Sequence, residues 1–263
     1  MITIKEYVRA ESLEQAYELN QKKKNKIIGG MLWLKMGSGA IDTAIDMCGL
    51  GLDKIEETDN SFVIGAMTSL RSLETHEGLN SYTDGAAKRA FENIVGVQFR
   101  NLATIGGSLW GRYGFSDVLT FLMSLDCCVE LYKGGIVPIE QFSKMKYDND
   151  IIVRIIIKKS DGIFAYSDMR IQSTDFPVLN CAVSRFDGMW RCSVGARPHK
   201  AVLIKDESGI LSENPTSEQA ASFAEMVAEM VNFGSNMRGS AEYRKHLAKV
   251  LITRLLTENG GNG

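Results

Sequence analysis

The sequence lacks most of the features that mark metal-binding and disulfide-rich proteins. Its 263 residues include only three histidines and five cysteines, and no two cysteines form a C-x-x-C pair. Scattered residues of this kind do not make a zinc or iron–sulfur site, which needs closely spaced ligands. An odd number of cysteines without a secretory signal predicts reduced, buried thiols.

An excess of charge of one sign is also missing. The chain has 30 Lys+Arg against 32 Asp+Glu, a net charge of -2, which gives no electrostatic basis for binding nucleic acid or an anionic membrane. No apolar run approaches the roughly 18 residues that span a bilayer, and the N-terminal segment is amphipathic rather than signal-like. We therefore expect a cytoplasmic protein with neither a nucleic-acid nor a membrane partner.

Common catalytic and nucleotide-binding motifs are absent as well. The glycines follow neither G-x-G-x-x-G nor G-x-x-x-x-G-K-[ST] spacing. No G-x-S-x-G elbow occurs, and no histidine stands beside a serine or cysteine in a recognised arrangement. Any redox chemistry in this chain would therefore be carried by a bound cofactor.

What the chain does contain is two Gly-Gly turns, each entered from an apolar segment. They are "IIGGMLWL" (27–34) and "TIGGSL" (104–109). A Gly-Gly pair either makes a tight turn or lets a ligand approach the backbone closely. Two such turns could hold a diphosphate from both sides through successive backbone N–H groups. Spacing alone leaves both interpretations open.

Polar and aromatic residues follow these turns. Trp33, Trp110 and Tyr113 could stack on a flat ring or cover the core. A helix cap is expected near Ser116 or Asp117, and in a ligand site Asp117 could accept hydrogen bonds from sugar hydroxyls.

Hydrophobic periodicity predicts a mixture of helices and strands. Ser12 is a candidate cap for the first helix, Thr68 for a helix after the strand 61–67, and Asp187-Gly188 suits a tight hairpin turn. The other expected strands are 127–132, 150–159 and three segments within 163–197, and the other expected helices are 85–94, 214–233 and 239–258.

Several ordered blocks resemble one known family. The block Q-x-R-N-x-A-T-I-G-G, which ends at Gly107, and S-A-E-Y-R at 240–244 are its most specific parts. Together with "KIIGGMLWL", "FVIGAMTSLRSLE", "RIQSTDFPVLNCAVS" and "VGARPHKA", they resemble the FAD-binding subunit or domain of the molybdenum hydroxylases, the xanthine dehydrogenase and carbon monoxide dehydrogenase family. The resemblance covers nearly the whole chain.

The resemblance implies an α+β fold of the vanillyl-alcohol-oxidase/PCMH-like type. An FAD-binding domain would occupy residues 1–160, with subdomains at about 1–55 and 56–160. A C-terminal domain with a three-stranded antiparallel sheet and helices would occupy 161–258. Residues 259–263 would be a disordered tail.

The resemblance also implies a role in electron transfer. A molybdopterin-binding large subunit would oxidise the substrate, [2Fe–2S] clusters on a small subunit would relay electrons, and the FAD of this chain would pass them to an acceptor such as NAD⁺. No side chain here would act as acid or base on the organic substrate. The residues implied at the cofactor are Ile27, Ile28, Gly29, Gly30, Met31, Leu32, Thr104, Ile105, Gly106, Gly107, Ser108 and Asp117.

The chain departs from the family pattern at three places. After its glycines the first loop usually continues with small hydroxyl and polar residues, whereas this chain has Met31, Leu32 and Trp33. Ser108 stands where an asparagine is usual, and Ser167 stands where a basic residue is frequent. These departures motivate an alternative interpretation, a structural or assembly subunit of the same complex with weakened or absent cofactor binding.

Overall fold

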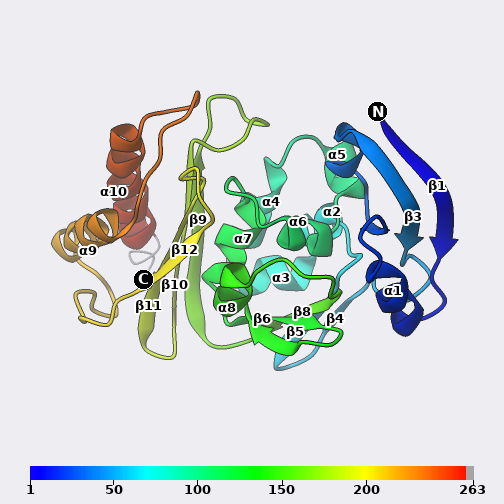
Figure 1. Ribbon diagram of the computed structural model, residues 1–263. Helices are drawn as coiled ribbons and strands as arrows, with labels where there is room; N and C mark the ends of the chain where they lie inside the picture. Colours follow the sequence, from blue (N-terminus) through cyan, green and yellow to red (C-terminus); the bar gives the residue numbers. More distant parts are fainter. Residues whose placement is uncertain (259–263) are drawn as a thin grey trace. The chain divides into compact units, whose positions relative to one another are not determined.

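The computed structural model describes residues 1–258, which form two compact units (Figure 1). The first unit gathers Met1–Ser72, Val97–Gly111 and Cys127–Ile157, and the second gathers Leu73–Gly96, Arg112–Asp126 and the chain from Lys158 onward. Each unit thus draws on separate stretches of sequence. The linear division at residue 160 stays a prediction, and the tail predicted at 259–263 lies outside the described residues.

The first unit holds two sheets. The order is β1-β3-β2 in a parallel sheet and β4-β5-β8-β6-β7 in a five-stranded sheet. The strands are β1 (Ile2–Arg9), β2 (Lys26–Ile28), β3 (Gly39–Asp46), β4 (Ile55–Glu57), β5 (Ser61–Gly65), β6 (Cys127–Leu131), β7 (Gly135–Pro138) and β8 (Ile152–Lys158). The helices are α1 (Leu13–Asn20), the 3-10 helix η1 (Leu34–Met36), α2 (Leu70–Glu74), α5 (Val97–Leu102), α6 (Ile105–Gly111) and α8 (Ile139–Lys144).

Helix α1 connects β1 to β2 and packs against the parallel sheet. Its cap is Ser12, whose side chain accepts a hydrogen bond from the N–H of Gln15, as the sequence predicts. Ala16 on this helix and Ile45 on β3 are both fully buried and belong to one apolar cluster.

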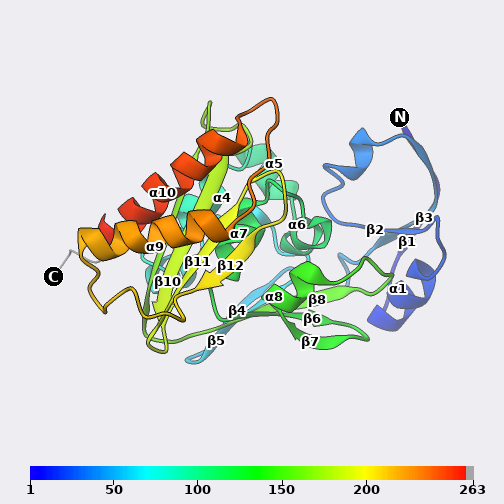
Figure 2. The ribbon, with the colours of Figure 1, turned by 60° about the vertical axis from the view of Figure 1, so that its left-hand side comes forward.

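The second unit is a three-layer arrangement around one antiparallel sheet of order β12-β11-β10-β9. Figure 2 shows α9 and α10 along one face of that sheet and α4 and α7 along the other. The strands are β9 (Gly162–Met169), β10 (Leu179–Phe186), β11 (Met189–Gly195) and β12 (Val202–Lys205). The helices are α3 (Glu77–Tyr82), α4 (Ala86–Glu92), α7 (Asp117–Met123), α9 (Ser217–Met230) and α10 (Ala241–Glu258).

Side chains alternate between the two faces of this sheet, and helices cover both faces. Cys181 and Val183 of β10 belong to the apolar cluster under α9 and α10, whereas Ser184, on the alternate face, donates a hydrogen bond to the carbonyl of Ser124 after α7. At the β10–β11 hairpin, Asp187 and Gly188 have φ values of 50° and 71°. Positive φ at both central residues is what a two-residue hairpin turn requires, so this prediction is confirmed.

Three details differ from the sequence predictions. The C-terminal sheet has a fourth strand, β12, whose four residues are too few to give a periodic signal. The side chain that caps α2 is Ser69, which accepts the N–H of Ser72, and not the expected Thr68, whose hydroxyl donates to the carbonyl of Lys54. Cys48 is exposed, so the prediction of buried thiols is wrong at that position.

Among residues 1–258, no helix is both long and apolar enough to cross a bilayer.

Candidate cofactor site

The first glycine turn lies directly after β2. Gly29 and Gly30 bend the chain, and Met31 adopts a left-handed conformation with φ of 57°. Such a conformation is costly for a residue with a long side chain, and strain of this type is concentrated at functional sites. The carbonyl of Met31 then accepts the N–H of Lys35, which starts η1.

This turn exposes backbone donors. Within residues 1–258, the N–H groups of Gly30, Met31 and Leu32 donate no hydrogen bond to the protein. Successive unpaired N–H groups in a turn form a concavity that attracts anions. The first turn is therefore chemically suited to a phosphate group.

The second glycine turn lies against the first. A Cβ atom added to Gly30 would lie 1.9 Å from the carbonyl oxygen of Leu102, and one added to Gly29 would lie 2.7 Å from Oγ1 of Thr104. Only glycine permits this approach of one backbone to another. The structure thus brings the two glycine turns together within the first unit.

The N–H groups of the second turn are already used within the protein. Ile105 donates to the carbonyl of Thr68, Gly106 to that of Ala66, and Gly107 to Oγ1 of Thr104, which caps α6. The hydroxyls of Thr104 and Ser108, four residues apart on one helical face, have no acceptor among the described residues. In the second turn, the groups left for a ligand are therefore hydroxyls rather than backbone amides.

The aromatic residues near the turns take different positions. Trp33 is 38% exposed and meets Phe99 edge-on, with ring centroids 6.5 Å apart. Trp110 packs against Tyr147 at 6.4 Å. Tyr113 belongs to the second unit, where it stacks on Phe115.

Asp117 also belongs to the second unit, at the start of α7. Of the two caps expected for α7, Ser116 is confirmed, because its side chain accepts the N–H of Leu119, and Asp117 is not the cap. Asp117 is instead buried at 5% exposure, and its Oδ1 accepts hydrogen bonds from the hydroxyl of Tyr166 at 2.6 Å and from Nδ2 of Asn180 at 2.8 Å.

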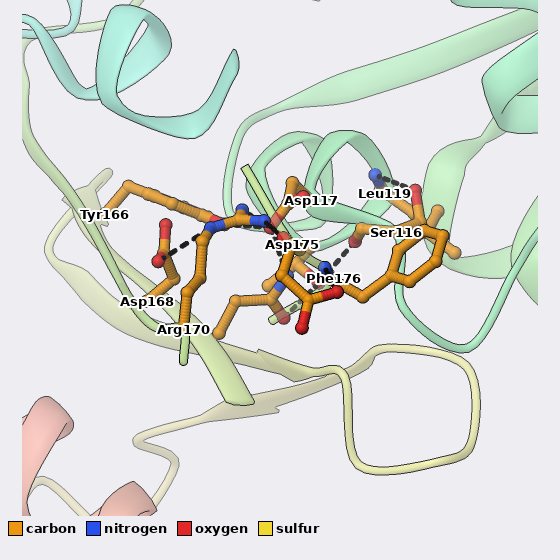
Figure 3. Close-up of polar contacts among 10 residues, drawn as sticks. Ser116, Asp117, Leu119, Tyr166, Asp168, Arg170, Asp175 and Phe176 are labelled. Atoms are coloured by element: carbon orange, nitrogen blue, oxygen red, sulfur yellow. Dashed lines mark hydrogen bonds and ion pairs between the residues drawn. The ribbon is translucent and has the colours of Figure 1, made fainter. Parts of the chain in front are cut away.

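Figure 3 shows a buried charge cluster around Asp117. Nη2 of Arg170 lies 2.7 Å from Asp117 Oδ1, and Nε of Arg170 donates to Asp168 at 2.9 Å. Nη1 of Arg170 also donates to the carbonyl of Asp175, which closes the β9–β10 loop at its base. Two carboxylates and one guanidinium are thereby held together beside β9 and α7.

Burial and charge shift the protonation equilibria in this cluster. Burial raises the pKa of Asp168, and Arg170 offsets only part of that rise. Burial and the charge of Asp117 raise the pKa of the Tyr166 hydroxyl well above its ordinary value, so this hydroxyl stays a hydrogen-bond donor. Burial by itself lowers the pKa of Arg170, but the two carboxylates outweigh it and the guanidinium stays charged.

Sequence reasoning missed this cluster except for Asp117. Tyr166, Asp168 and Arg170 alternate along β9 and the residue after it, and therefore share one face of the strand. That i, i+2, i+4 pattern of polar residues in a strand was the available signal.

Comparisons with known proteins identify the family. The family model described as the FAD binding domain in molybdopterin dehydrogenase matches residues 3–159. The chain belongs to this family. Residues 164–259 match the CO dehydrogenase flavoprotein C-terminal domain.

The similarity to relatives covers nearly the whole length of this chain. YgfM of Escherichia coli K12 is 26% identical over 97% of this chain and 96% of its own. The nicotine 6-hydroxylase medium subunit of Paenarthrobacter nicotinovorans is also 26% identical, over 97% of this chain and 96% of its own. The reconstituted CO dehydrogenase structure from Oligotropha carboxidovorans superposes with a TM-score of 0.85 at 21% identity, over 99% of both chains.

The cofactor of this family is FAD, and the residues of the first unit fit its diphosphate. Unpaired N–H groups lie at Gly30, Met31 and Leu32, the adjoining backbone leaves no room for a Cβ at Gly30, and hydroxyls without an acceptor among the described residues lie at Thr104 and Ser108. Neutral donors of this kind are the chemistry that a diphosphate needs.

Proposed function

We propose that this chain is the FAD-binding, electron-transferring medium subunit of a xanthine dehydrogenase-like molybdenum hydroxylase. It would receive electrons from [2Fe–2S] clusters on a partner subunit and deliver them to an acceptor such as NAD⁺. The observation that carries the proposal is the contact of the two glycine turns beside three unpaired backbone N–H groups. This contact is so close that a Cβ at Gly30 would lie 1.9 Å from the carbonyl oxygen of Leu102.

The residues of the first unit would hold the diphosphate. In this proposal the N–H groups of Gly30, Met31 and Leu32 donate to phosphate oxygens, and the hydroxyls of Thr104 and Ser108 donate from the second turn. The other residues proposed at the cofactor shape the two turns; they are Ile27, Ile28, Gly29, Ile105, Gly106 and Gly107. When bound, FAD supplies the redox chemistry.

Asp117 is proposed as a further contact to the cofactor. Its Oδ1 accepts hydrogen bonds from Tyr166 and Asn180 and lies in an ion pair with Arg170, whereas its Oδ2 has no hydrogen bond among the described residues. A contact to FAD would therefore use Oδ2, while Oδ1 holds the carboxylate in place.

The partners are proposed from the relatives. The nicotine 6-hydroxylase relative is named as a medium subunit, which supports an assembly of this chain with a molybdopterin-binding large subunit and a [2Fe–2S] small subunit. The family models meet between residues 159 and 164, which supports a division into domains at 1–160 and 161–258.

The test is the flavin content and flavin reduction of the native complex. The complex is purified through a tag on this chain, and its visible spectrum is recorded before and after anaerobic reduction of its own [2Fe–2S] clusters. We expect the flavin absorbance to bleach as the clusters are reduced, and to return on addition of NAD⁺ as NADH forms. A complex that releases no FAD on denaturation, and that takes up no FAD when FAD is added, would refute electron transfer and leave the cofactor-free assembly subunit as the function.

A further inference from the structure

Trp33 has an unusual environment for a tryptophan. Of the chain's three tryptophans, Trp190 is 3% exposed and donates its Nε1–H to the carbonyl of Ser212, and Trp110 is partly buried against Tyr147. Trp33 is 38% exposed, and Met36, three residues further along the chain, is 73% exposed. The Trp33 ring is therefore accessible to a ligand, and an aromatic ring favours a flat, stacked partner.

The ring of Trp33 is held in place rather than loose. It is the residue before η1, it contacts Phe99 of α5 at 6.5 Å with an interplanar angle of 75°, and the N–H of Met36 donates to its carbonyl. An oriented ring loses little conformational freedom when a ligand stacks on it.

Trp33 is also close to the proposed diphosphate site. It follows Gly30 by three positions, a reach of at most about 10 Å. In FAD the adenine is joined to the diphosphate through one ribose, whereas the flavin is joined through a longer open chain. The adenine is therefore the flat ring that must stay nearer to the diphosphate.

We infer that Trp33 is a stacking platform for the adenine of the cofactor. The inference rests on the proposed function, because it takes the two glycine turns as the diphosphate site. It assigns a positive role to one of the departures from the family pattern. The hydrophobic residue at this position would add stacking where the loop has lost polar side chains.

The test uses the full chain freed of cofactor and two probes that each represent part of FAD. ADP carries the adenine and the diphosphate, and inorganic pyrophosphate carries the diphosphate alone. Affinities are measured by calorimetry for the wild type, Trp33→Ala, Trp33→Phe and Met36→Ala. Met36→Ala is the matched control because it removes an exposed apolar side chain three residues away.

We expect Trp33→Ala to bind ADP about 5- to 150-fold more weakly, the range that base–aromatic stacking gives. Its affinity for pyrophosphate should equal that of the wild type, Trp33→Phe should recover most of the ADP affinity, and Met36→Ala should change neither affinity. ADP should quench tryptophan fluorescence in the wild type and not in Trp33→Phe, although Trp110 and Trp190 remain.

Two results would overturn the inference, and they differ in whether the proposed function is also refuted. If Trp33→Ala binds ADP as the wild type does while the wild type binds FAD and pyrophosphate, the platform is refuted and the diphosphate site stands; weaker assembly of that variant with the other subunits would then assign Trp33 to a protein interface. If the wild type binds neither FAD nor pyrophosphate, alone or in the complex, the proposed function fails together with the inference.

Discussion

Substitution of Gly30 by alanine should separate the two glycine turns. The new Cβ would lie 1.9 Å from the carbonyl oxygen of Leu102, 2.5 Å from its carbonyl carbon and 3.2 Å from the nitrogen of Ala103. All three are backbone atoms, so no side chain can rotate away. Because real Cβ contacts essentially never fall below 3.0 Å, the turns must move apart by about 1 Å or more.

The expected loss of stability and of FAD affinity in Gly30→Ala follows from the cost of overpacking. Forcing a methyl group into a well-packed contact costs about 1–3 kcal/mol. If the strain is relieved by displacing the first turn, its N–H groups lose their alignment and FAD affinity should fall about 5- to 150-fold. Calorimetric titration of the full chain with FAD measures this change, and thermal unfolding records how much of the cost appears as lost stability.

Gly37→Ala is the matched control. Its Cβ would contact only the carbonyl oxygen of Leu34, at 3.3 Å, and a shift of a few tenths of an ångström relieves that contact. Gly29→Ala should be intermediate, because its 2.7 Å contact is with the side-chain oxygen of Thr104. If Gly30→Ala unfolds at the wild-type temperature and binds FAD with wild-type affinity, the contact between the turns is not what forms the site.

Three further predictions concern the second turn and the second unit. Ser108→Asn, which restores the residue usual in the family, should tighten FAD binding about fivefold, the value of one added hydrogen bond of about 1 kcal/mol, as measured by the same titration. Burial raises the pKa of Asp168 above its unfolded value of 3.8, so its contribution to stability is present at low pH and is lost as the pH rises through the raised pKa. Urea unfolding of Asp168→Asn and of the wild type between about pH 3 and pH 7 should therefore show the variant gaining stability relative to the wild type as the pH rises. Arg244→Lys should lower the free energy of unfolding by about 3 kcal/mol, because an ammonium cannot make all the hydrogen bonds of the guanidinium. The fully buried guanidinium of Arg244 donates to four acceptors, which are the carbonyls of Val178, Gly234 and Gly239 and Oδ1 of Asn236.

Each of these three predictions has its own contrary result. A Ser108→Asn variant that binds FAD no better than the wild type would separate this site from the family pattern. A pH-independent difference for Asp168→Asn would mean that Asp168 titrates alike in the folded and unfolded chains. For Arg244, the neighbouring Lys245 gives the control, since Lys245→Ala should change stability by about 0.5 kcal/mol or less; an equal effect of both variants would contradict the account.

Helix caps and tight turns could be predicted from the sequence, because they depend on residues that are neighbours in the chain. Ser12 capping α1 and the Asp187-Gly188 turn depend only on neighbouring residues and appear as expected. Short elements gave weaker signals. Strand β12 is four residues long, and the cap of α2 is Ser69, one residue after the Thr68 that the sequence suggested.

The site was only partly visible in the sequence. Both glycine turns could be identified, but nothing local indicates that Gly30 lies against Leu102, since that contact depends on tertiary packing. Nor does the sequence show which amides stay unpaired. Asp117 was found, but its partners Tyr166 and Asn180 are 49 and 63 residues away, so its burial among them could not be predicted.

The central claim is that the amides of the first glycine turn bind the diphosphate of FAD. Amide hydrogen exchange of the full chain, with and without saturating FAD, tests it most directly. The account predicts that FAD slows exchange at Gly30, Met31 and Leu32, with little change at residues 105–108, whose amides are already hydrogen-bonded. Unchanged exchange at residues 30–32 in the presence of bound FAD would contradict it.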